Sequence, residues 1–184
     1  MIDFDLVFAK MNEELIVINE TFELICAGGY VMQRNGYRST TDVDAFYSSS
    51  IEIDEIIRRV GDLFNINRED ELWLNNSISN MNQEPSLEYC DMVIQLSNLK
   101  VLTVKLDYLI GMKLLSAREQ DIIDVATILK QNNNKEPLQL RIKLFQMGFD
   151  IDISLLLDAY EYAYGIEWLD EFYRDFEHDI RELY

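Results

Sequence analysis

One short segment near the N-terminus constrains the fold more than any other part of the chain. The apolar run Phe22–Ala27 ends at Gly28 and Gly29, and a second apolar run, Val43–Tyr47, follows Tyr30–Asn35, which is long enough for a short helix. Short apolar runs bounded by turn residues are typical of buried strands, and paired glycines mark a tight turn. The segment therefore predicts a strand–turn–helix–strand unit, and with it an α/β (α+β) fold.

The rest of the chain predicts a small mixed sheet flanked by helices, with a C-terminal helical extension. Apolar residues at three- and four-residue steps predict helices, and two strand-like runs separated by Ser97-Asn98 predict a hairpin. The polar loop Gln131–Pro137 predicts a boundary between a first domain, residues 1–130, and the helical extension, residues 131–184. The expected helices cover residues 4–18, 53–64, 72–81, 108–117, 121–129, 138–147, 153–164 and 168–183, and the expected hairpin strands cover residues 89–96 and 99–104.

Charge and composition exclude several classes of function. The chain has 184 residues, of which 48% are hydrophobic, and its formal net charge is −18. Such a charge repels polyanions and anionic lipid, which argues against duplex DNA and membrane surfaces as partners. The longest apolar runs are far shorter than the roughly 20 residues of a membrane-spanning helix, and the acidic N-terminus is unlike a signal peptide. We therefore expect a cytoplasmic protein.

Histidine and cysteine content narrows the chemistry further. His178 is the only histidine, which excludes catalysis by two histidines and most zinc sites. Cys26 and Cys90 lie in apolar runs, where buried free thiols are expected. A bound metal should therefore be a hard cation held by carboxylates.

The strand–turn–helix–strand segment carries groups suited to a metal–triphosphate. Gly28 and Gly29 leave backbone N–H groups exposed at a helix start, where an anion can approach the main chain closely. Asp42 and Asp44 alternate with apolar residues on a strand, so they project from the same face and can share divalent cations. The Asp-x-Asp pattern also occurs at residues 3–5 and 150–152, but only the Asp42 pair follows a strand–glycine–helix unit.

This segment resembles the signature of a known superfamily. Gly28-Gly29 followed by Arg38-Ser-Thr40-Thr-Asp42-Val-Asp44 is similar to the motif of polymerase-beta-like nucleotidyltransferases, closest to the toxin-type members of bacterial abortive-infection systems and their uncharacterised relatives. The segment Leu106–Leu129 is similar to a helical pattern of the same family, although Ala117 and Arg118 are adjacent here. Trp73-Leu-Asn-Asn76 resembles an element of some uncharacterised relatives. Together the resemblance covers about residues 20–130.

The resemblance implies a nucleotidyltransferase fold and roles for the residues of the first block. Asp42 and Asp44 would bind Mg²⁺ or Mn²⁺. Gly28 and Gly29 would line the triphosphate of an NTP. Two further residues would support or contact phosphate, Arg38 and Thr40.

The resemblance also implies roles for residues later in the chain. Lys113 would neutralise phosphate charge across the cleft, and Asp121 or Asp124 would orient that lysine or the acceptor. Asp91 is the candidate for a third carboxylate and metal ligand, although it could equally be an ordinary edge-strand aspartate. Lys113 could likewise be an exposed helix lysine, and Arg118 with Asp121 a solvent-exposed salt bridge.

The function that the resemblance implies is transfer of a nucleoside monophosphate from an NTP to a hydroxyl acceptor, with release of pyrophosphate. The acceptor could be an RNA end, a protein hydroxyl or a small molecule, and a toxin-type member would have an antitoxin or other protein partner. Two alternatives stay open: a catalytically degenerate nucleotide-binding module of the same fold, and an interaction protein whose acidic surface binds a basic partner.

Overall fold

A computed structural model describes residues 1–68, 71–80 and 83–181, without the side chains of residue 80 and residues 176–181. It forms two compact units, residues 1–105 and the chain from residue 106 on. The first unit contains α1 (Phe4–Ile18), β1 (Phe22–Cys26), α2 (Gly28–Arg34), β2 (Val43–Phe46), α3 (Ile51–Phe64), β3 (Leu74–Asn75), β4 (Cys90–Gln95) and β5 (Leu99–Val104). The second contains α4 (Leu106–Ser116), α5 (Glu119–Gln131), α6 (Pro137–Gln146), α7 (Ile153–Tyr164) and α8 (Ile166–Arg181).

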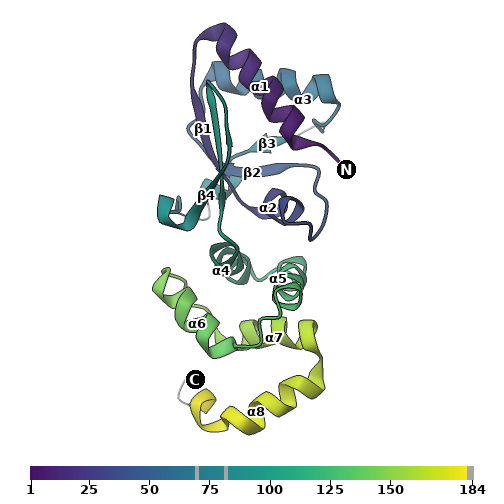
Figure 1. Cartoon of the computed structure of the whole chain (residues 1–184), viewed down its shortest axis with the longest axis vertical. Coiled ribbons are helices and arrows are strands. Elements are labelled where there is room, and N and C mark those ends of the chain that lie inside the picture. The colour runs from purple at the N-terminus through teal and green to yellow at the C-terminus, as the bar shows by residue number, and fades with distance from the viewer. Residues whose placement is uncertain (69–70, 81–82, 182–184) are drawn as a thin grey trace. The chain divides into compact units, whose positions relative to one another are not determined.

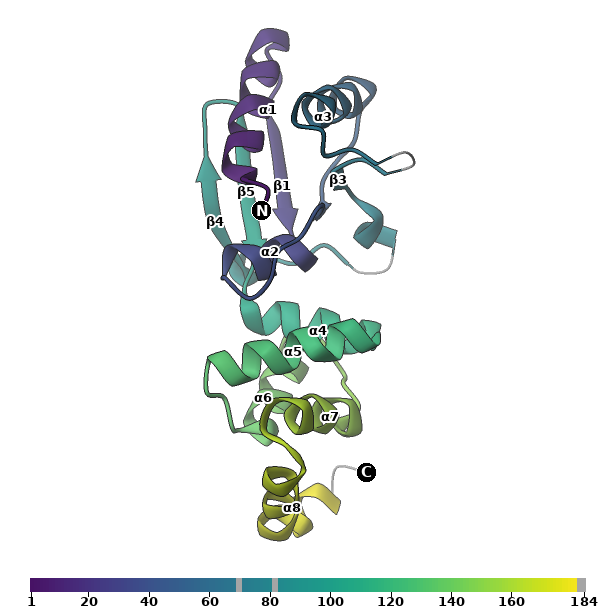
Figure 2. The ribbon, with the colours of Figure 1, turned by 90° about the vertical axis from the view of Figure 1, so that its right-hand side faces the viewer.

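The first unit is built on a five-stranded mixed sheet in the order β3-β2-β1-β5-β4 (Figures 1 and 2). Strand β1 pairs antiparallel with β2 and parallel with β5, while β3 adds to β2 in parallel. Strands β4 and β5 form the antiparallel hairpin predicted from the sequence. The α/β fold class, with a small mixed sheet flanked by helices, is confirmed.

The core of this unit lies between one face of the sheet and the helices α1 and α3. Alternate residues of the central strands point into it, including Leu24 and Cys26 of β1 and Val43 and Ala45 of β2. Asp44, between the last two, therefore lies on the opposite face, as strand alternation predicts. This alternation keeps the carboxylate out of the core.

The segment predicted as a helix over residues 72–81 is instead a short strand followed by a 3₁₀ turn, Ser77–Asn80; residue 81 is outside the described residues. Trp73 is fully buried, and its indole N–H donates to the Ile57 carbonyl at 2.8 Å. Its own carbonyl accepts from the Val43 N–H at 2.7 Å, which fixes the segment as a strand beside β2. Asparagine is a weak helix former, so these tertiary bonds outweigh the local preference.

The second unit is all-helical. Helix α5 packs against α4 and α7, and α7 packs against α6 and α8. The rings of Tyr160, Trp168 and Phe172 stack in sequence, with centroids 5.4 and 5.6 Å apart. Because α4 and α5 bury their apolar faces against these later helices, the units divide at residues 105 and 106, whereas the polar loop predicted a boundary at residues 130 and 131. None of the helices within the described residues is long and apolar enough to cross a membrane.

Candidate active site

Asp42 and Asp44 lie at the start of β2, on the wall of a cavity of about 450 Å³. This volume falls within the range of small-molecule sites. Asp42 precedes the strand and Asp44 is its second residue, and both are half-buried. The cavity is lined by these two aspartates together with Tyr47, Glu71, Leu72, Leu74, Asn75, Asn76 and Ser77.

The glycine turn packs directly against the second aspartate. Gly28 has a φ of +57°, a left-handed conformation that favours glycine. A Cβ at Gly28 would lie 2.7 Å from Asp44 Oδ2, so a larger residue would collide with the carboxylate. The N–H of Ala27 donates to the Asp44 carbonyl at 2.8 Å, which fixes the turn to β2. The strand ends and the turn therefore meet as the sequence predicts, although α2 begins at Gly28 instead of Tyr30.

Gly29 packs against the loop that leads into β2. A Cβ at Gly29 would lie 2.4 Å from Thr40 Oγ1 and 3.5 Å from Arg38 Nη1. The Thr40 hydroxyl donates to Asp42 Oδ1 at 2.8 Å. The structure thus brings Gly28, Gly29, Arg38, Thr40, Asp42 and Asp44 together in one place.

Strand β3 completes the other side of the cavity. Asn75 pairs with Asp44 across the parallel β2–β3 ladder, and the amide of Asn76 donates to the Tyr47 carbonyl at 3.3 Å. Burial, with a smaller contribution from Asp54, raises the pKa of Tyr47 to about 12, so its hydroxyl stays protonated at neutral pH. We did not predict Tyr47, Glu71 or the asparagines as site residues. The Trp-Leu-Asn-Asn element was the signal, because Trp73 anchors the strand that presents the asparagines.

Asp91 lies elsewhere in the sheet. It is on β4, the edge strand opposite β3, with β5 and β1 between β4 and β2. Since neighbouring strands lie about 4.8 Å apart, three strand spacings place Asp91 roughly 14 Å from β2. A metal ion bound by Asp42 and Asp44 is out of reach of this carboxylate. The structure therefore does not support Asp91 as the third ligand.

The second unit holds Lys113, Asp121 and Asp124 as a buried charge cluster. Lys113 Nζ lies 2.9 Å from Asp121 Oδ1 and 2.6 Å from Asp124 Oδ2, and its side chain is only 6% exposed. The alternative of an exposed helix lysine is therefore wrong. Arg118, which is 75% exposed, contacts Asp121 at 2.6 Å, so only one end of that salt bridge faces solvent.

The pKa of Asp121 reflects two opposing effects, burial and the neighbouring positive charges. Burial alone would raise it, but the hydrogen bonds and positive charges of Arg118 and Lys113 outweigh burial and hold the pKa below its ordinary value. Asp124 also accepts from the Gln120 side-chain amide at 3.0 Å. Asp121 therefore favours its ionised form, and the contacts with Asp121 and Asp124 hold Lys113 in one position. The catalytic roles expected for Lys113, Asp121 and Asp124 stay predictions.

One further group near the site fits a structural role. Cys26, directly before the glycine turn, is a buried free cysteine whose pKa is raised well above its ordinary value by burial. It is therefore a neutral thiol and a poor nucleophile. Within the described residues, no group of three or more His, Cys, Asp or Glu side chains is arranged to hold a metal ion.

Comparison with known proteins agrees with this geometry. Residues 3–146 match a family described as nucleotidyltransferases of unknown function (DUF6036). The chain belongs to this family. Comparisons with curated proteins and with solved structures gave no significant match. In this nucleotidyltransferase family member, the matched region holds every candidate site residue and extends through α6, so it includes helices of both compact units.

Proposed function

We propose that the protein is a metal-dependent nucleotidyltransferase that moves a nucleoside monophosphate from an NTP to a hydroxyl acceptor and releases pyrophosphate. Membership of the family gives the reaction class. The observation that carries the proposal is the contact of Gly28 with Asp44 and of Gly29 with Thr40, because it sets a glycine turn at a helix start directly against the carboxylate pair. Phosphate oxygens and hard cations need these two features side by side.

The residues at the cavity fit Mg²⁺ or Mn²⁺. Asp42 and Asp44 offer hard oxygen ligands on one wall. Two carboxylates suit Mg²⁺ in particular, since this ion commonly takes one or two carboxylates and completes its coordination with water and substrate phosphate. When bound, such an ion stabilises the negative charge of the transferred phosphoryl group.

The protein's own groups would bind and orient the nucleotide. The backbone at Gly28 and Gly29 has no side chain to obstruct a phosphate. Arg38 would add positive charge at the triphosphate. The hydrogen bond from Thr40 holds Asp42 in one orientation, so the carboxylate is positioned before the nucleotide arrives.

The charge of the cavity bears on the acceptor. Asp42, Asp44 and Glu71 line it, and no basic side chain does so among the residues that the structure describes. An RNA end would bring several phosphates, which proteins normally bind with Lys and Arg. The cavity therefore favours an uncharged or cationic hydroxyl acceptor over RNA.

A toxin-type role rests on the resemblance of the Arg38–Asp44 segment alone. Expression of an active toxin-type enzyme in bacteria would slow growth, and Asp42→Asn with Asp44→Asn would relieve the effect. Equal growth with wild type and the double variant would contradict this role, and would leave the transferase proposal in place.

The transferase proposal is tested by Mn²⁺–nucleotide calorimetry and by pyrophosphate release in the presence of each NTP. We expect the wild type to bind and to release pyrophosphate, and the Asp42→Asn/Asp44→Asn variant to do neither. Asp91→Asn is the matched control, because it removes one aspartate at the opposite edge of the same sheet. Binding without pyrophosphate release would indicate the nucleotide-binding module instead. Binding that survives the double substitution would refute the metal site.

A further inference from the structure

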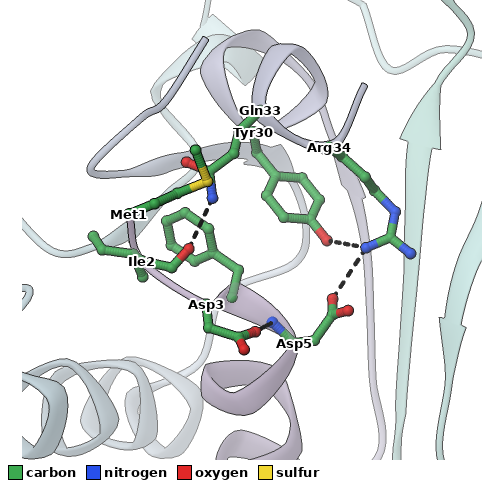
Figure 3. A pocket seen from close by; sticks show the side chains of 8 residues that line it. Met1, Ile2, Asp3, Asp5, Tyr30, Gln33 and Arg34 are labelled. Carbon is green, nitrogen blue, oxygen red and sulfur yellow. Dashed lines mark hydrogen bonds and ion pairs between the residues drawn. The ribbon is translucent and has the colours of Figure 1, made fainter. Parts of the chain in front are cut away.

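Gln33 of α2 connects two segments that are distant in the sequence. Its side-chain N–H donates to the Ile2 carbonyl at 2.8 Å (Figure 3), and its side-chain oxygen accepts from the Thr40 backbone N–H at 2.9 Å. The residue is half-buried. One amide group therefore joins the N-terminal segment, helix α2 and the loop before β2.

The chemistry of this position requires a side chain that both donates and accepts, as the Gln33 amide does. A backbone N–H can only donate and a backbone carbonyl can only accept, so the bridging group must accept on one side and donate on the other. Glutamate has no hydrogen to donate to Ile2, and methionine has neither group. These two residues are close in size to glutamine, which makes each an informative replacement for Gln33.

The end of the bridge at Ile2 is firmly anchored. Asp3 caps α1 by accepting from the N–H groups of Asp5 and Leu6, and the neighbouring Phe4 is only 3% exposed. The cavity of about 480 Å³ beside this bridge is lined by residues 1–5, Tyr30, Gln33 and Arg34. Arg34 is paired there with Asp5 at 3.0 Å and lies 3.4 Å from the Tyr30 hydroxyl, as Figure 3 shows. These contacts around the cavity hold the N-terminal segment, and with it the Ile2 end of the bridge, in place.

The other end of the bridge lies in the candidate site. The Thr40 backbone N–H donates to the Gln33 side-chain oxygen, its hydroxyl donates to Asp42, and its side chain packs against Gly29. Helix α2 itself starts with the glycine turn. A single side chain on α2 therefore sets the separation between the turn and the loop that carries Thr40 and Asp42.

We propose that Gln33 is a positioning residue for the nucleotide site. It holds Thr40 against the glycine turn, in the position from which the Thr40 hydroxyl orients Asp42. This proposal rests on the proposed function, since it assigns Gln33 a role in binding a metal–nucleotide.

Gln33→Met and Gln33→Glu test the proposal through two measurements, amide hydrogen exchange at Thr40 and Mn²⁺–nucleotide affinity. With Gln33→Met, we expect Thr40 to exchange about tenfold faster and the affinity to fall about tenfold, as for loss of one well-placed hydrogen bond. With Gln33→Glu, exchange at Thr40 stays slow, because the acceptor for its N–H remains. Asn35→Ala is the matched control: Asn35 donates to the Val31 carbonyl on the same helix and should alter neither measurement.

The outcomes separate this proposal from the proposed function. All variants are compared at a temperature at which their near-ultraviolet circular dichroism matches that of the wild type, so that global unfolding does not contribute. Unchanged exchange or unchanged affinity in Gln33→Met, with affinity still lost in Asp42→Asn/Asp44→Asn, would overturn the role of Gln33 and leave the proposed function standing. A wild-type protein that binds no nucleotide would overturn both.

Discussion

A Cβ on Gly29 would lie 2.4 Å from the hydroxyl oxygen of Thr40 and 2.8 Å from its Cβ. The loop before β2 can approach the turn after β1 this closely only because residue 29 is glycine. Since Thr40 in turn bonds to Asp42, a displacement of Thr40 would reach the proposed metal ligands. The glycine turn and the carboxylates are therefore mechanically linked.

Gly29→Ala should lower Mn²⁺–nucleotide affinity by about tenfold or more, because Thr40 has to move away. The free energy of unfolding should fall by about 1–3 kcal/mol, the usual effect of an overpacked contact. Calorimetry and urea unfolding measure the two effects separately.

Two other glycines provide controls for this substitution. Gly36 has a φ of +77° and nothing within 4 Å of its Cβ position, so Gly36→Ala adds backbone strain alone and should leave affinity unchanged. Gly28→Ala adds both backbone strain and a collision with Asp44, and should lower Mn²⁺–nucleotide affinity more than the other two substitutions. Equal nucleotide affinity in Gly29→Ala and the wild type would show that Gly29 is a structural turn only.

Lys113→Met should strongly destabilise the protein. The substitution leaves the carboxylates of Asp121 and Asp124 buried without their shared cation, which typically costs about 3–5 kcal/mol. An exposed helix lysine, the alternative that the sequence left open, would contribute little to stability. Urea unfolding of the variant measures the change.

The control for Lys113→Met is Lys100→Met, which breaks a salt bridge to Glu23 whose two side chains are about half exposed. That pair should contribute less than about 1 kcal/mol. Adding Asp121→Asn and Asp124→Asn to Lys113→Met should recover part of the lost stability, since it removes the buried negative charges that Lys113 balanced. Similar stability of the Lys113 and Lys100 variants would contradict the buried cluster.

The stability that Asp121 contributes should disappear in acid. Its pKa is lower in the folded protein than its ordinary value of 3.8, so the folded state favours the ionised form. Such a group stabilises the fold fully above its unfolded pKa, and the contribution is lost as the pH falls through the folded pKa. The difference in unfolding free energy between wild type and Asp121→Asn should therefore narrow below about pH 4. Urea unfolding of both proteins above and below this pH is the measurement. A free-energy difference that widens in acid would contradict the lowered pKa of Asp121.

The acidic cavity predicts which acceptors receive label from a radioactive NTP. Total RNA should remain unlabelled, whereas uncharged or basic hydroxyl-bearing acceptors should be modified, because Glu71 adds negative charge beside the proposed metal ligands and no basic side chain lines the cavity among the described residues. Glu71→Lys should shift any residual transfer toward RNA. Efficient labelling of RNA 3′ ends by the wild type would contradict the prediction.

The sequence by itself determined most of the local elements and named the residues that meet at the candidate glycine–aspartate site. Apolar periodicity located α1, α3 and the helices of the second unit, and short apolar runs located β1, β2 and the β4–β5 hairpin. Strand alternation placed Val43 and Ala45 in the core and Asp44 on the other face. These features depend on neighbouring residues along the chain, where side-chain spacing translates directly into structure.

Only the tertiary structure decided which distant residues meet. Strand order put Asn75 beside Asp44 and put Asp91, the third carboxylate proposed from the sequence, at the opposite edge. Burial of Trp73 makes the segment predicted as a helix form β3 instead. Lys113 is buried because it pairs with two aspartates of the next helix, Asp121 and Asp124. The role proposed for Gln33 depends on its hydrogen bonds to the carbonyl of Ile2 and to the N–H of Thr40, which only the folded chain brings together. Contacts of this kind depend on backbone groups and burial, which are set by packing across the fold and leave no spacing pattern in the sequence.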